Sequence, residues 1–147
     1  MAAGYAPEKV MNGTFAQCWV NDYFLAEGTE MEAKISLEKK EVKQSGTLAK
    51  GYKIVGTEGK GKIKINKISS FFIDLIAENL KAGKTTVCTM ISNLQDPDSG
   101  GQSERVKLIG VTFDELTLVN WKTKELVEEE VAFTFSDFDI LDTVANN

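Results

Sequence analysis

The sequence predicts a mainly β protein, an antiparallel β-sandwich or barrel with one flanking α-helix and a long loop or hairpin arm. Residues 30–37 and 59–66 alternate apolar or glycine residues with polar ones, which is the period of a strand with one buried face. Only residues 70–82, approximately, have a convincing helical period. Between the two alternating segments, residues 38–58 form a polar, lysine-rich run without proline. These observations define the expected architecture.

The amino-terminal part of the chain predicts a hairpin. Residues 14–20 are β-branched and aromatic, Asn21 and Asp22 form a turn, and residues 23–25 form a short second strand.

The segment at residues 38–58 is longer than an ordinary connection, because loops beyond about 12–15 residues are uncommon in compact domains and are usually functional or disordered. A turn signal at residues 44–47 has weakly alternating flanks, which indicates a long hairpin that becomes ordered against a partner. A solvated, mobile surface loop is the alternative. As hypothetical subunit or ring interface residues we take Lys39, Lys40, Glu41, Val42, Lys43, Leu48, Lys50, Tyr52, Lys53 and Ile54.

The glycines that follow match the spacing of a phosphate-binding P-loop from Gly56 to Lys62. A P-loop continues into Ser or Thr and then a helix, whereas here Ile63 follows and the alternation of a strand continues. We therefore expect no nucleotide site. Gly59 and Gly61 instead let a bulky side chain or another backbone approach the sheet closely.

The helix begins at a cap, Ser69 or Ser70, and ends at Gly83. Its apolar face consists of Phe72, Leu75, Ile76 and Leu80. The remaining strands are predicted at residues 85–94, 104–113, 116–121 and 127–136, with turn-forming residues at 96–101.

Two groups of carboxylates could suggest calcium. They are Asp96, Asp98 and Glu104, and Asp137, Asp139 and Asp142. The first lacks the spacing of an EF-hand, and a turn explains it better. The second lies just beyond a strand, where the apolar residues between the acids would anchor the carboxy-terminal tail. We expect no bound metal and no cofactor.

Composition limits the function classes. The chain has 147 residues, which is the size of one domain. Histidine is absent, which removes the commonest general base and metal ligand and argues against an enzyme. Cys18 and Cys88 are expected to be buried free thiols rather than a disulfide. No apolar run approaches the roughly 20 residues that cross a bilayer, so we expect no membrane insertion by this chain alone.

Charge is divided along the chain. Residues 34–67 contain ten lysines and three glutamates, net +7, whereas residues 96–147 contain twelve acidic and four basic residues, net −8. The two segments either neutralise each other within one subunit or meet between copies in a head-to-tail contact. A lysine-rich strand could also bind nucleic acid, but it lacks interleaved aromatic residues and the whole chain is acidic.

Several stretches, taken together and in order, resemble a known family. They are KIKINKI (residues 62–68) running into the helix, NLQDPD (93–98), VTFDELTL (111–118), and FTFSDF (133–138) with LD (141–142). They are similar to the tail-tube proteins of PBSX-type contractile phage tails and of phage-tail-like bacteriocins. The resemblance covers nearly the whole chain, residues 1–147 as one tail-tube domain, and its motifs are structural rather than catalytic.

The resemblance implies a structural protomer that assembles with itself into hexameric rings, which stack into a hollow tube inside a contractile sheath. The implied partners are the sheath protein, a baseplate tube initiator and a tape-measure protein, with DNA passing through the lumen without specific binding in a phage. The implied location is a virion or tail-like particle made in the bacterial cytoplasm. Strands of adjacent subunits would join around the channel, which removes exposed sheet edges.

Another function class remains open at this point. A monomeric β-barrel that binds a small ligand would place Trp19, Trp121 and phenylalanines around an apolar cavity. A carboxylate-based enzyme has no constellation of residues to support it.

Overall fold

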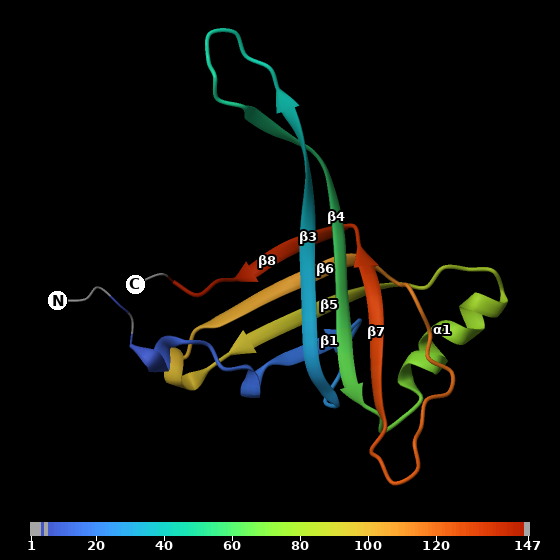
Figure 1. Cartoon of the computed structure of the whole chain (residues 1–147). Helices are drawn as coiled ribbons and strands as arrows, with labels where there is room; N and C mark the ends of the chain where they lie inside the picture. Colours follow the sequence, from blue (N-terminus) through green and yellow to red (C-terminus); the bar gives the residue numbers. More distant parts are fainter. Residues whose placement is uncertain (1–3, 5, 146–147) are drawn as a thin grey trace.

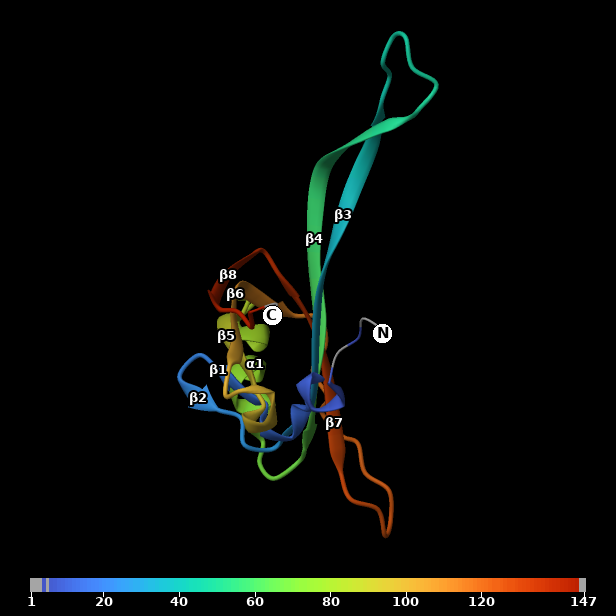
Figure 2. The ribbon, with the colours of Figure 1, turned by 90° about the vertical axis from the view of Figure 1, so that its left-hand side faces the viewer.

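The computed structural model describes residue 4 and residues 6–145 as two crossing layers of antiparallel strands with a long hairpin projecting from one of them (Figures 1 and 2). The strands are β1 (Gln17–Val20), β2 (Tyr23–Phe24), β3 (Gly28–Val42), β4 (Gly51–Asn66), β5 (Val87–Gln95), β6 (Ser103–Phe113), β7 (Glu128–Phe135) and β8 (Asp137–Asp142). The helix α1 spans Phe71–Lys81, and three short 3-10 helices are η1 (Pro7–Lys9), η2 (Gly13–Phe15) and η3 (Pro97–Ser99).

The strand order is β2-β1-β5-β6-β7-β4-β3, and β8 also pairs with β6. One layer contains β3, β4 and β7, and the other contains β2, β1, β5, β6 and β8 (Figure 2). The layers are joined where β6 pairs with β7 through Thr112 with Thr134 and Phe113 with Phe133. The mainly β class with one helix is therefore confirmed, and the layers form a sandwich that stays open along β3.

The predicted alternation in β4 places its residues as expected. Ile63 and Ile65 are each 1% exposed, whereas the side chains of Lys62 and Lys64 are 44% and 38% exposed. Gly59 lies opposite Phe135 and Gly61 opposite Phe133 in the β4–β7 ladder. The absence of a side chain at both glycines gives the two phenylalanine rings room to pack.

The core lies between the layers. Its buried side chains are Cys18, Val20, Leu25, Ile63, Ile65, Phe72, Ile76, Cys88, Met90, Leu108, Val111, Val131, Phe133 and Phe135. Cys18 and Cys88 are both free thiols, as predicted. Burial raises the pKa of the Cys18 thiol to about 12, and burial also raises the pKa of Cys88.

Helix α1 closes one end of the space between the layers (Figures 1 and 2). Phe72 is 1% exposed and packs edge-on against Phe113 at 5.6 Å between ring centroids. Ser70 is the N-cap residue, but its side chain makes no capping hydrogen bond. The helix ends as expected before Gly83, whose φ of +71° suits glycine. Leu80, predicted on the buried face, is 62% exposed because the last turn extends beyond the sheet.

Two predictions about the carboxy-terminal third are wrong. Residues 116–121 do not form a strand, but belong to a loop at residues 114–127, called the base loop below. Residues 137–142, expected as an anchored tail, form the strand β8, which pairs with β6. The apolar residues of β8 remain substantially exposed, so pairing of the backbone holds this segment more than burial does.

The turn at residues 96–101 has the predicted form. Asp96 is 6% exposed, and its carboxylate accepts hydrogen bonds from the backbone N–H groups of Asn12 at 2.9 Å and Asp98 at 3.0 Å. This carboxylate therefore fixes the turn and holds the amino-terminal segment against it. No group of three or more potential metal-ligating side chains is found in the described part of the chain. Among the same residues, no helix has the length and apolar character needed to cross a membrane.

Candidate assembly surface

The predicted arm is a continuous two-stranded ribbon. β3 and β4 pair from Gly28 with Ile65 to Val42 with Gly51. β7 accompanies β4 only from Asn66 to Gly59, so the part of the hairpin beyond Gly59 stands free of the sandwich (Figures 1 and 2). The hairpin interpretation is therefore confirmed, and the strands extend well into the segment that could have been a mobile loop. Only residues 43–50 lie outside them.

All ten predicted interface residues are exposed on this arm. The register places Lys39 opposite Ile54 and Glu41 opposite Tyr52, so these four side chains share one face of the ribbon. Lys40 lies directly opposite Lys53 on the other face. Like charges in this position destabilise a strand pair, so an acidic partner surface would relieve a repulsion that exists within the subunit.

The arm also carries apolar surface with no cover from its own subunit. Leu48 at the tip is fully exposed, Tyr52 is 60% exposed and Ile54 is 50% exposed. An isolated two-stranded hairpin is at best marginally stable in water. A ribbon of this length with exposed apolar residues is therefore typical of a surface that binds another protein.

Charge on the arm differs from charge on the body of the same hairpin. On the body, Lys62, Lys64 and Lys67 each pair with a carboxylate of β7. The partner distances are 3.6 Å to Glu130, 3.1 Å to Glu128 and 3.5 Å to Glu129, respectively. Hydrogen bonding and the charge of Glu128 raise the pKa of Lys64. This part of the basic segment is thus neutralised within one chain.

The arm lysines differ from those of the body. Among the described residues, no carboxylate forms an ion pair with Lys39, Lys40, Lys43, Lys50 or Lys53. Of the two alternatives left open by the sequence, local neutralisation therefore holds for the body of the hairpin. Attraction between copies remains available to the arm.

The sandwich also leaves strand edges open. Within the described residues, the outer edge of β3 pairs with no other strand, and β7 meets β6 only at Phe133 and Thr134. Unpaired N–H and C=O groups along such edges are templates for pairing with another chain. The layer of β3, β4 and β7 can therefore be extended on both sides by neighbouring subunits.

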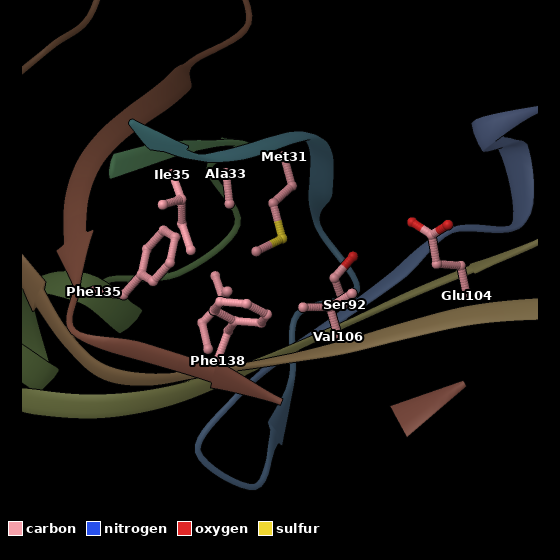
Figure 3. Close-up of a pocket in the computed structure, with 9 residues that line it drawn as sticks. Met31, Ala33, Ile35, Ser92, Glu104, Val106, Phe135 and Phe138 are labelled. Atoms are coloured by element: carbon pink, nitrogen blue, oxygen red, sulfur yellow. The ribbon is translucent and has the colours of Figure 1, made fainter. Parts of the chain in front are cut away.

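A cavity of about 240 Å³ lies where the sandwich opens between β3 and the second layer. Met31, Ala33 and Ile35 point into it from β3 toward Phe138 and Val106, and Glu104 stands apart at one end (Figure 3). Pockets for small ligands usually have about 300–1,000 Å³ and bury most of the ligand. This cavity is smaller and open at the side.

The tryptophans do not build the cavity that a ligand-binding barrel requires. Trp19 is partly buried and lies against Phe24, with ring centroids 5.3 Å apart. Trp121 is 69% exposed on the base loop. The alternative of a ligand-binding barrel would require both rings around one apolar cavity, whereas they lie on different parts of the surface.

Comparisons with known proteins give a consistent picture. The family model described as phage tail tube protein matches residues 4–142. The phage-like element PBSX protein XkdM of Bacillus subtilis (strain 168) is 31% identical over 134 residues, which cover 90% of this chain and 91% of that protein.

Two solved structures show the same fold at low sequence identity. A chain of the extracellular contractile injection system PVC sheath–tube complex, in the extended state, has a TM-score of 0.72 at 8% identity and covers 97% of this chain and 100% of that one. A chain of the anti-feeding prophage cap, which terminates the AFP tube, has a TM-score of 0.66 at 10% identity, with coverage of 97% and 95%.

Proposed function

The chain belongs to the phage tail tube protein family, so its role is structural, and we propose that its copies close into hexameric rings that stack into a hollow tube. The whole chain acts as one tail-tube domain. The tube lies inside a contractile sheath and is driven through the envelope of a target cell. The protein performs no catalysis.

The observation that carries this proposal is the free arm. The described part of the same chain offers no partner to the ten exposed residues predicted as interface, which include the arm lysines and the apolar tip. The arm extends away from the sandwich instead of folding over it (Figure 1). Contact with another copy buries this surface and stabilises a ribbon that is weak alone.

The open sheet edges supply the contacts within a ring. Pairing of the β3 edge of one copy with the next copy would continue the layer of β3, β4 and β7 around the channel. The outward face of this layer carries Lys62 and Lys64 already paired with carboxylates. A channel lined by such a face gives DNA no free row of cations, which suits passage without specific binding.

The partners expected beyond the tube follow from the same assembly. They are the sheath protein around the tube, a tube initiator in the baseplate at one end, and a tape-measure protein in the lumen. The complete particle is a phage tail or a phage-tail-like bacteriocin assembled in the bacterial cytoplasm.

Shortening the arm tests the proposal. Replacing residues 40–55 with a two-residue turn should leave the sandwich folded, because the removed residues lie outside the core. The shortened chain should still unfold in one cooperative thermal transition, whereas negative-stain microscopy should show no tubes.

The matched control reverses the charge of two exposed lysines at the end of α1, Lys81→Glu with Lys84→Glu, and should still form tubes. Normal tubes from the shortened chain would contradict the assigned role of the arm.

A further inference from the structure

The arm and the base loop lie at opposite ends of the molecule (Figures 1 and 2). β7 starts at Glu128, directly after the base loop, and runs beside the lower half of β4. The upper half of β4 forms the arm with β3. β4 and β7 therefore run along one axis, with the base loop at one end and the arm tip, residues 39–54, at the other.

The base loop exposes an unusual amount of apolar surface. Leu118 is 66% exposed, Val119 is 78%, Trp121 is 69% and Leu126 is 94%. These side chains extend away from the core, so their exposure gives the isolated subunit no stability. A rim of apolar side chains on a projecting loop is typical of a protein–protein contact.

The base loop is also hollowed. A depression of about 200 Å³ is lined by Asn120, Trp121, Lys122, Glu125, Leu126, Val127 and Glu128. It combines an indole and a leucine with amide, carboxylate and ammonium groups. Such a lining fits a side chain with an apolar body and a polar end, as tyrosine and lysine have.

The arm tip carries side chains of this kind. It holds Tyr52 and five lysines against one glutamate, net +4. The base loop holds three carboxylates against two lysines, net −1. A lysine of the arm can be attracted to Glu125 and can also lie over the face of the Trp121 indole as a cation–π contact.

We propose that the base loop is the receiving surface for the arm tip of a second copy placed end to end along the strand direction. This inference rests on the proposed function, because it names the partner surface of the arm. The two surfaces differ from each other and lie at opposite ends of one subunit, so the contact is heterologous. Repetition of such a contact adds copies without closing, which produces growth along the tube axis.

Two experiments test the proposal. The first is the double variant Trp121→Ser with Leu126→Ser, which changes only exposed side chains and should leave the fold and the rings intact. Negative-stain microscopy should show rings in place of tubes. Normal tubes overturn the inference, and so does the loss of rings together with tubes, because that result would assign the base loop to contacts within a ring.

The second experiment is cross-linking of assembled protein under oxidising conditions. Leu48→Cys combined with Leu126→Cys should give a ladder of covalent multimers on a non-reducing gel. The matched pair, Leu48→Cys with Leu80→Cys, should not, since Leu80 is also exposed but belongs to α1 and not to the base loop. Each single variant controls for pairing of identical positions. The natural thiols are buried and do not interfere.

The outcomes separate this inference from the proposed function. If the unmodified chain forms no assembly, both fall. If it forms tubes whose arm cysteine joins position 80 and not position 126, only the receiving surface assigned here is wrong.

Discussion

Gly61 lies directly opposite Phe133 in the β4–β7 ladder, and the phenylalanine ring occupies the space that a Cβ on residue 61 would need. Phe133 is fully buried, and the carbonyl oxygen of Glu32 on β3 also closes on the same position. The glycine thus fixes the distance between the sheet and its aromatic core.

Gly61→Val should therefore destabilise the subunit, by about 1–3 kcal/mol as for other overpacked cores. Urea unfolding followed by tryptophan fluorescence measures the change. Gly13→Ala is the control, because nothing lies within 4 Å of a Cβ there, and it should change the free energy of unfolding by less than about 0.5 kcal/mol. Equal effects at both positions would contradict the close packing of Phe133 on residue 61.

Helix α1 offers a matched pair of apolar residues. Phe72→Ala should lower the free energy of unfolding by about 3–5 kcal/mol, because the buried ring leaves a cavity beside Phe113. Leu80→Ala, at an exposed position of the same helix, should change it by less than about 0.5 kcal/mol. Comparable losses for the two variants, measured by thermal unfolding, would place α1 differently on the sandwich.

The ion pairs between β4 and β7 differ in burial. Glu129 has a side chain only 3% exposed beside Lys67, whereas Glu130 is 54% exposed beside Lys62. Lys67→Met leaves a buried carboxylate without its cation and should cost about 3 kcal/mol. Lys62→Met removes a solvated pair and should cost less than about 1 kcal/mol. Chemical denaturation at neutral pH measures both, and a larger loss at Lys62 would contradict the burial described here.

The raised pKa of the Cys18 thiol predicts that the free energy of unfolding depends on pH in the alkaline range. Its pKa is raised from 9.0 to about 12 by burial, so between these values the unfolded chain loses a proton that the folded chain keeps. Its contribution to stability is therefore complete below pH 9 and decreases as the pH rises from 9 to 12. Denaturation at several alkaline pH values should show a smaller loss of unfolding free energy for Cys18→Ala than for the unmodified chain. Identical slopes would contradict the raised pKa.

Much of the fold could be predicted because burial on one side of a strand or helix leaves a period in the sequence. The alternation around Ile63 and Ile65, the helix built on Phe72, and the turn fixed by Asp96 all follow from local rules. The sequence also predicts the bounds of the arm but not the extent of its strands, because both faces of the ribbon meet water and apolar and polar residues no longer alternate clearly.

The wrong predictions concern segments whose strand pairing or exposure does not follow from the local sequence pattern. Residues 116–121 are apolar enough for a strand, yet no strand of the described chain pairs with them, so they remain a loop with Trp121 exposed. The adjacent apolar residues Leu118 and Val119, which break strict alternation, were the available signal for this surface. In β8, Phe138 and Ile140 alternate with acids but are 41% and 52% exposed, so the period marks no buried face, and pairing with β6 is what makes this segment a strand.

The neutralisation of charge was also beyond sequence reasoning. The numbers of charged residues predict opposite net charges on the two segments, but not which lysines pair with carboxylates inside the chain. The register of β4 with β7 decides this for Lys62, Lys64 and Lys67 and leaves the arm lysines unpaired within the described chain.

Hydrogen exchange of the arm amides tests most directly whether one copy completes the arm of another. In dilute protein without assemblies, the amides of residues 38–42 and 51–58 should exchange quickly while those of residues 59–66 are protected by β7. In concentrated protein that contains tubes, the arm amides should become protected as well. Slow exchange of the arm in the dilute monomer, or no change on assembly, would contradict the account.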